Sequence, residues 1–170
     1  MKITARLFLA ALLLAALPLS AQTFDWSMPG STGIQTQGGS FLATAAGPTL
    51  KFNSFSSGTL VSRYLVTNTF GSGGAGGSKT PGWTTLHAAF TDNSPSASVT
   101  AKLYEVDACT FTVTEICSIS SSDAAGAQCA SCVFNSSTFD FANNTYYVEV
   151  TLSRSATSGV AAEIHSVAIN

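Results

Sequence analysis

The four cysteines are the side chains with the most obvious chemistry, and they are Cys109, Cys117, Cys129 and Cys132. The last two form a Cys-x-x-Cys motif, which is the spacing of a redox dithiol. Such dithiols are activated at a helix N-terminus, whereas the residues after Cys132 indicate a strand or turn. A four-thiolate zinc site needs two short ligand spacings, and Cys109 and Cys117 supply none. The sequence therefore predicts two structural disulfides. Three pairings are open, and proximity favours Cys109–Cys117 with Cys129–Cys132.

The two imidazoles, His87 and His165, are the candidates for a general base. If Val150 pairs with Ile164, Glu149 lies directly opposite His165 across two strands. No Gly-x-Ser-x-Gly elbow follows a strand to supply a nucleophile. We interpret the pair as a polar cross-strand contact, assign no catalytic residue, and keep a secreted hydrolase as the second alternative.

The carboxylates are few and scattered along the chain. A glycosidase needs two carboxylates facing each other across a cleft, and no such pair is indicated. Asp92 with Asn93, or Asp140 with Asn143 and Asn144, offers hard oxygen ligands for calcium. Asp and Asn clusters more often form turns by bonding local backbone groups. We therefore assign no metal site, and calcium is the only cofactor that the pattern leaves open.

Aromatic side chains outside the expected core are candidate ligand contacts. Trp83, Tyr104 and Tyr147 lie opposite the apolar sets of their strands, where exposed rings would form a platform for sugars. Thr85, His87 and Lys102 share this expected outer face. A carbohydrate-binding module, with a polysaccharide as partner, is therefore the first alternative function.

The N-terminal residues predict a signal peptide over residues 1–21. Lys2 and Arg6 precede an apolar run at 7–17, and the small residue Ala21 suits cleavage. At 11 residues the run is too short to span a bilayer. We expect a secreted or periplasmic protein that does not span the membrane. Cleavage leaves five basic and nine acidic side chains, a net charge of −4 that argues against nucleic acid as a partner.

The stretch 83–107 shows the architecture most clearly. Alternating apolar residues define the inner face of each strand, and the turn at 92–96 joins the two strands. Pairing them as a hairpin places Phe90, Ala88 and Leu86 opposite Val99, Ala101 and Leu103. The same register aligns His87 with Lys102 and Thr85 with Tyr104 on the outer face.

Further short strands follow the same period of two. Leu60, Ser62, Tyr64 and Val66 share one face of a strand, and residues 146–152 alternate cleanly. The last strand changes phase near His165 and Ser166, which indicates a β-bulge. Residues 22–58 are weakly patterned. Residues 22–170 are therefore expected to form one all-β domain, an antiparallel β-sandwich stapled by disulfides.

The 83–107 pattern, the segment TYYVEVTLS and the ending IHSVAIN resemble exported bacterial β-sandwich domains of the jelly-roll type. The resemblance covers about residues 59–170. It implies a jelly-roll-like fold and an extracytoplasmic setting, and no catalytic residue carries over. The function expected from the sequence is a non-enzymatic surface, matrix or binding component, whose partner would be a polysaccharide or a cell-surface protein.

Overall fold

The structure is a computed structural model that describes residues 25–38, 42–68, 80–124, 126–157 and 160–170. The predicted signal peptide at 1–21 lies outside these residues. The described part consists of short strands and one 3-10 turn, η1 (Gly30–Thr32). The strands are β1 (Trp26–Pro29), β2 (Ile34–Gln37), β3 (Ala43–Ala46), β4 (Thr49–Phe52), β5 (Gly58–Val66), β6 (Thr85–Asp92), β7 (Ala97–Asp107), β8 (Val113–Ser120), β9 (Ala127–Val133), β10 (Asn144–Arg154) and β11 (Ala162–Ile169).

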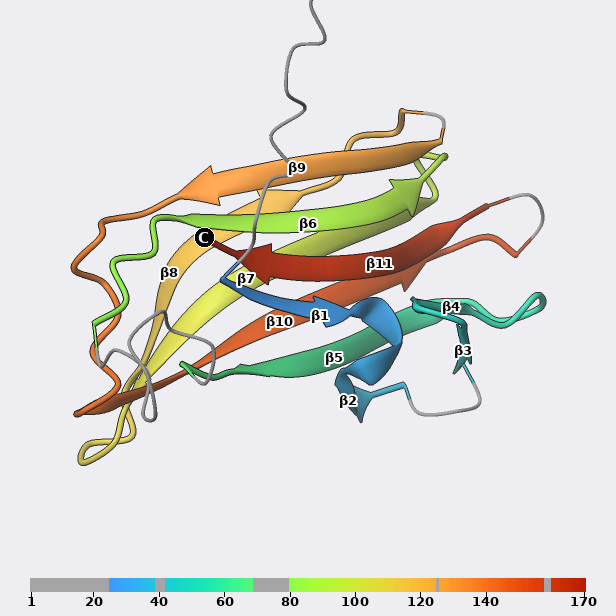
Figure 1. Ribbon diagram of the computed structural model, residues 1–170. Coiled ribbons are helices and arrows are strands. Elements are labelled where there is room, and N and C mark those ends of the chain that lie inside the picture. Colours follow the sequence, from blue (N-terminus) through green and yellow to red (C-terminus); the bar gives the residue numbers. More distant parts are fainter. Residues whose placement is uncertain (1–24, 39–41, 69–79, 125, 158–159) are drawn as a thin grey trace, which may run out of the picture.

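Two antiparallel sheets pack face to face, as the layers of Figure 1 show. Sheet A has the order β3-β4-β11-β6-β9, with β1 also paired to β11, and sheet B has the order β2-β5-β10-β7-β8. The eight strands from β4 to β11 divide into β4-β11-β6-β9 and β5-β10-β7-β8, which is the strand order of a jelly roll. The predicted antiparallel β-sandwich is confirmed. None of the helices among the described residues is long and apolar enough to cross a membrane.

The core forms because alternate residues of the central strands point between the sheets. In β10, Tyr146, Val148, Val150 and Leu152 are fully buried, while the residues between them are partly exposed. The predicted inner face of β5 is likewise buried from Leu60 onward. Burial of each large apolar side chain contributes about 1.5–3 kcal/mol. The period of two in the sequence therefore identifies the core correctly.

The pairing of β6 with β7 as a hairpin is wrong. β6 pairs with β11 and β9 in sheet A, and β7 pairs with β10 and β8 in sheet B. The turn at 92–96 carries the chain from one sheet to the other. The inward residues, such as Leu86 and Leu103, are buried as expected, because strands that face each other across a sandwich need the same alternation as paired strands. The outward residues consequently lie on opposite surfaces.

The N-terminal segment also crosses between the sheets. β1 pairs with β11 in sheet A, and β2 pairs with β5 in sheet B. Between them, η1 passes so close to β11 that a Cβ at Gly30 would lie 2.0 Å from the carbonyl oxygen of Ile164. The Tyr64 hydroxyl donates a hydrogen bond of 2.6 Å to the Gly30 carbonyl. Burial raises the pKa of Tyr64 to about 12, so the crossing is held by a neutral tyrosine.

An aromatic cluster closes the sandwich beside the start of β6. Phe139 is fully buried and packs against Trp83 at 5.1 Å and Tyr146 at 4.6 Å between ring centroids. Phe134 and Phe141 complete the cluster. Trp83 is only 3% exposed, so its prediction as a ligand-facing ring is wrong. It precedes β6, where the chain is no longer a strand and strict alternation no longer sets the direction of a side chain.

A buried arginine lies near the opposite end of β10. Arg154 donates hydrogen bonds to the carbonyl oxygens of Ser56, Asn53 and Val160. Its guanidinium also lies 4.9 Å from the centroid of the Phe52 ring. Desolvation lowers the pKa of Arg154, and the carbonyl oxygens compensate the buried charge. This arginine ties down the β4–β5 connection.

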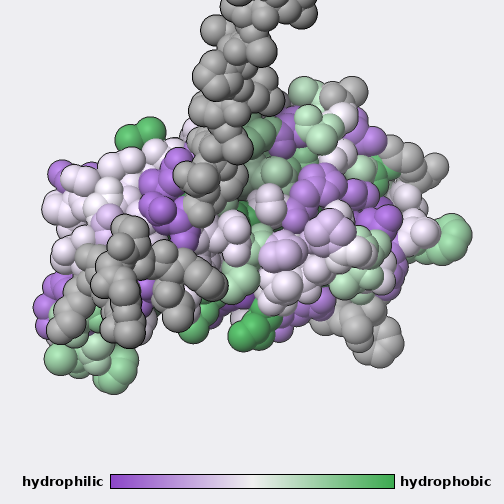
Figure 2. Space-filling model, in the orientation of Figure 1, coloured by the Kyte–Doolittle hydropathy of each residue, from purple (hydrophilic) through white to green (hydrophobic). Residues whose placement is uncertain are grey.

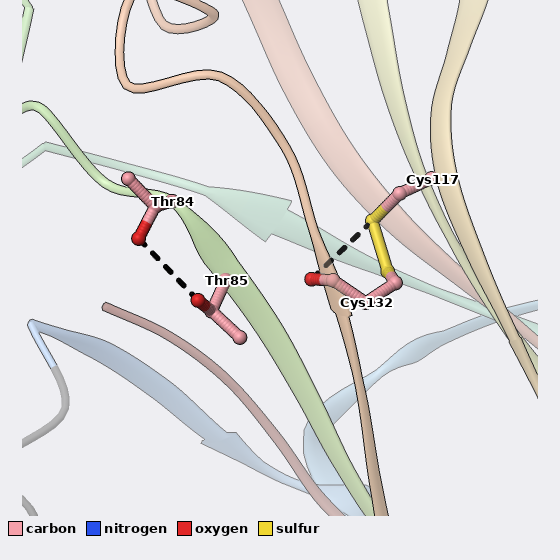
Figure 3. The surroundings of a disulfide bond; sticks show 4 residues. All are labelled: Thr84, Thr85, Cys117 and Cys132. Carbon is pink, nitrogen blue, oxygen red and sulfur yellow. Dashed lines mark hydrogen bonds between the residues drawn. A yellow bond between two sulfur atoms is a disulfide. The ribbon is translucent and has the colours of Figure 1, made fainter.

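The prediction of two disulfides is also wrong. One bond, Cys117–Cys132, joins β8 to β9 with a Cα–Cα distance of 6.1 Å (Figure 3). Cys109 and Cys129 are free and exposed. Cys129 and Cys132 are three residues apart on one strand, so their side chains point to opposite faces and cannot meet. β8 and β9 are edge strands of different sheets, so the disulfide links the two layers. Sequence proximity could not reveal this, because the pairing depends on the topology.

Candidate functional site

The ligand-facing residues predicted from the sequence divide between two surfaces. Lys102, Tyr104 and Tyr147 lie on the outer face of sheet B. Thr85 and His87 lie on the outer face of sheet A, on β6. The structure brings the first three together and separates them from the other two. Two surfaces of different chemistry therefore have to be considered.

The outer face of sheet B carries a stacked aromatic pair. Tyr104 and Tyr147 are directly opposite each other on β7 and β10. Their ring centroids are 5.1 Å apart, with 24° between the ring planes. The guanidinium of Arg63, from β5, lies 4.9 Å from the centroid of the Tyr147 ring. The three side chains form a continuous stack across neighbouring strands, which we call the tyrosine stack.

Charged side chains surround the tyrosine stack. Arg63 donates a hydrogen bond of 2.8 Å to Glu149, and Lys102 donates one of 2.8 Å to Glu115. The bond to Glu149 raises the pKa of Arg63. Burial raises the pKa of Tyr147 although Arg63 opposes it, so the phenol is neutral at physiological pH. The surface thus combines charges of both signs with the neutral phenol of Tyr147.

An exposed leucine extends the stack. Leu65 is the direct β5 neighbour of Tyr147 and is 59% exposed. Sequence reasoning missed Leu65 and Arg63 as surface contacts. A signal was present for Arg63, because strict alternation along β5 places it on the outer face beside the charged and aromatic residues of β10. Leu65 gave no such signal, because an apolar residue at an outward position of a core strand suggests that the outer face is buried as well.

The opposite end of the same face is rich in hydroxyl groups. Ser153 lies between Thr59 and Ser98 on the neighbouring strands, and the Oγ atoms of Ser153 and Thr59 are 3.4 Å apart. These residues line a hollow of about 560 Å³ together with Pro95, Ser155 and others. Sheet B therefore presents a face that changes from hydroxyl groups at one end to aromatic rings at the other.

The outer face of sheet A has smaller side chains. A groove of about 390 Å³ has His87, His165 and Cys129 among its lining residues, together with Ala89 and Ala168. Figure 2 views the molecule from this side and shows pale and green residues over β6 and β9. The Nε2 atom of His87 lies 3.0 Å from Oδ1 of Asn170. This face also carries Lys51 and Glu163, directly opposite each other on β4 and β11, and unlike sheet B it has no aromatic stack among the described residues.

His165 and Glu149 do not form a pair. The expected pairing of β10 with β11 is wrong, because these strands belong to different sheets. Both ring nitrogens of His165 contact hydroxyl groups, at 2.9 Å from Thr49 and 2.8 Å from Thr91. The predicted β-bulge at His165–Ser166 is confirmed by the register shift of β11 against β6. The bulge directs His165 to these threonines, so its ring links β11 to β4 and β6.

The Asp and Asn clusters considered for calcium form turns. Asp140 accepts hydrogen bonds from the backbone of Ala142 and from the side chain of Asn143. Asp92 is buried and accepts a hydrogen bond from the Ser121 hydroxyl. Within the described ranges, no three His, Cys, Asp or Glu side chains gather as a metal would require. The carboxylates accordingly stabilise connections between strands.

The chain matches no protein-family model, and no curated protein matches it at a significant level. No activity, partner or site residue is therefore carried over from a relative.

Proposed function

We propose that the protein is an exported, non-enzymatic binding domain that contacts a protein partner on the cell surface or in the surrounding matrix. The contact surface is the outer face of sheet B, centred on the tyrosine stack. The observation that carries the proposal is the stacking of Tyr104 on Tyr147 beside the exposed Leu65. Tyrosine and arginine are enriched among the residues that dominate protein–protein binding energy.

The geometry of the stack favours a protein over a sugar as the occupant. A sugar platform presents an open ring face, which packs on the apolar face of a pyranose. Here the Tyr147 ring stacks against Tyr104 and also carries the guanidinium of Arg63. The exposed Leu65 lies directly beside it on β5. Such a mixture suits hydrogen bonding and apolar packing against a protein surface.

Export is supported by two observations. The disulfide between Cys117 and Cys132 is typical of oxidising compartments. The N-terminal charge and apolar pattern is typical of a signal peptide. Together they support a secreted or periplasmic location, which belongs to the proposal.

Binding of the labelled mature protein to intact cells of the producing organism tests the proposal. Tyr104→Ala combined with Tyr147→Ala should weaken saturable binding by about thirty-fold, the effect of losing a strong interface contact. The matched control is Thr85→Ala combined with His87→Ala on sheet A, which should bind like the wild type. Equal binding by all three proteins, each shown to be folded by circular dichroism, would refute the proposed surface.

A carbohydrate-binding module is the second candidate, and the hydroxyl-lined hollow favours it. Hydroxyl groups from Thr59, Ser98 and Ser153 lie where a polysaccharide could exchange hydrogen bonds. A polysaccharide panel with Ser98→Ala combined with Ser153→Ala separates the candidates. Sugar binding that this variant loses and the double tyrosine variant keeps would favour the module. Absence of binding to every sugar tested would remove this candidate.

A further inference from the structure

The edge of sheet A at β9 has open backbone hydrogen-bonding groups. β9 pairs with β6 on one side, and no described strand pairs with it on the other (Figure 1). In an antiparallel ladder, alternate residues direct their N–H and C=O groups toward the same neighbour. The N–H of Phe134 bonds to Thr84 on the β6 side. The even-numbered residues of β9 therefore bond to β6, and Ala127, Cys129, Ser131 and Val133 direct theirs outward.

This edge lacks the usual protection against strand pairing. Natural edge strands are blocked by charged residues, prolines or bulges. β9 has the sequence AQCASCV, without charge or proline, and its seven residues pair with β6 in an unbroken register. At the same side of the sandwich, β8 carries Glu115 and a register shift. The two edges thus differ, and β9 is the one open to another strand.

We propose that a second copy of this chain occupies the β9 edge, forming a two-fold antiparallel β9–β9 pair. β9 carries no charged residue, so two β9 strands do not repel each other electrostatically. A register centred on Cys129 pairs Ala127 with the Ser131 of the second copy and gives about six backbone hydrogen bonds. The two six-stranded sheets then become continuous. The interface is isologous, as expected for a symmetric dimer.

The free thiol of Cys129 fits this register. Cys129 is exposed and remains unpaired inside the protomer. Directly opposite residues of a hydrogen-bonded antiparallel pair have a Cα–Cα distance of about 5.5 Å, which suits a disulfide, and their Cβ atoms need to approach by only about 1 Å for the bond to form. Shifting the centre by one residue places the two thiols on a diagonal, about 7–8 Å apart, which is too far. A Cys129–Cys129 bond therefore reports the proposed register.

The bond forms by ordinary thiol–disulfide exchange. Oxidised glutathione, a small disulfide, supplies the oxidising power. The two Cys129 S–H bonds and the glutathione S–S bond break, and the intermolecular S–S bond forms. Glutathione leaves as two thiols that carry the two protons and two electrons. Cys109 serves as a built-in comparison, because it is equally free and exposed but lies in the β7–β8 turn, away from the edge.

The experiment is oxidation of the purified mature protein in a glutathione buffer, followed by non-reducing mass analysis and peptide mapping. We expect a covalent dimer linked by Cys129, lost in Cys129→Ser and retained in Cys109→Ser. Ser131→Pro removes an outward N–H and leaves the bonds to β6 intact, so dimer formation should be about ten-fold lower than in the matched Ser131→Ala. Ser131→Lys, which adds a charge on the exposed face, should lower it as well.

Three results would overturn the proposal. One is a Cys129 thiol that stays free after oxidation of the folded protein, and another is a dimer linked through Cys109. The third is equal dimer formation by Ser131→Pro and Ser131→Ala, which would mean that surface thiols meet by collision without strand pairing. Circular dichroism of each variant before oxidation, with the Cys117–Cys132 bond intact, establishes that the monomer is folded. If Ser131→Pro does not fold, Ser131→Lys takes its place in the comparison with Ser131→Ala.

Discussion

The two outer faces of the sandwich are built from the same kind of strand but carry different chemistry. Sheet B presents the tyrosine stack with charged neighbours and a hydroxyl-rich end. Sheet A presents alanine, serine and cysteine side chains around two histidines that already contact neighbouring side chains. We therefore place the proposed binding surface on sheet B, where the exposed aromatic side chains gather. The other face ends at an open strand edge that suits a second copy.

The inner faces lack such a difference, because both sheets contribute apolar residues to one core. Alternation in each strand therefore separates two tasks. Inward residues determine stability, and outward residues are free to differ between the sheets. Four substitutions or titrations test this separation, and they are ordered here from the largest expected effect to the smallest.

Leu103→Ala tests the inward half of β7. Leu103 is fully buried, and its truncation should lower the free energy of unfolding by about 2–5 kcal/mol in urea denaturation. The matched outward control is Thr100→Ser on the same strand, which should change it by less than about 0.5 kcal/mol. Similar effects of the two substitutions would break the division between inner and outer residues.

Removal of the disulfide tests the edge at which the two sheets are linked. Cys117 and Cys132 close a loop with a sequence separation of 15, so Cys117→Ser combined with Cys132→Ser should cost about 3 kcal/mol. Urea denaturation measures the loss. Cys109→Ser combined with Cys129→Ser keeps the Cys117–Cys132 bond; it is the control under the same non-reducing conditions and should leave stability unchanged. A larger loss of stability in the Cys109/Cys129 variant would mean that these two cysteines, rather than Cys117 and Cys132, form the stabilising bond.

Alkaline titration compares an inner and an outer tyrosine of sheet B. The pKa of Tyr64 is about 12 in the folded chain, against an ordinary value of 10.0. Between pH 10 and pH 12 the unfolded chain loses this proton while the folded chain keeps it, so stability falls as the pH rises. The fall at pH 12 is about 2 kcal/mol.

Tyr64→Phe should abolish this part of the pH dependence, while Tyr147→Phe, on the outer face, should leave it in place. Denaturation at pH 9, 10 and 11 provides the comparison. A stability curve for Tyr64→Phe that falls as steeply as that of the wild type would contradict the burial of this phenol.

A double-mutant cycle on Tyr104 and Tyr147 has the smallest expected effect on stability. Stacked aromatic pairs contribute about 0.5–1.5 kcal/mol beyond their burial. Replacing each tyrosine by alanine, alone and together, should reveal a coupling energy in this range. A coupling energy of zero would show that the rings do not stack in solution.

The fold was largely predictable because the alternation of inward and outward residues along a strand can be recognised without knowing which strands pair. Val148 and Val150 are inward in any antiparallel sheet, and the bulge near His165 follows from a change of phase. The partners were not predictable. The separation of β6 from β7 and the bond between Cys117 and Cys132 depend on the jelly-roll topology, which sequence distance does not encode.

The candidate site followed the same division. The outward positions of Tyr104 and Tyr147 were predicted from their strands, and their direct pairing required the register of β10 against β7. His87 lies on a long regular strand and is outward as expected, but on the other surface. The prediction for Trp83 was wrong because this residue precedes β6 and its ring packs into the aromatic cluster.

Footprinting on intact cells tests the central claim, that sheet B carries the binding surface, most directly. The mature protein is oxidised by hydroxyl radicals when free and when bound to cells, and side-chain modification is measured by mass spectrometry. We predict that modification of Tyr104, Tyr147 and Leu65 falls on binding, while that of His87 does not change. Protection of His87 with continued modification of both tyrosines would contradict the assignment and place the partner on sheet A.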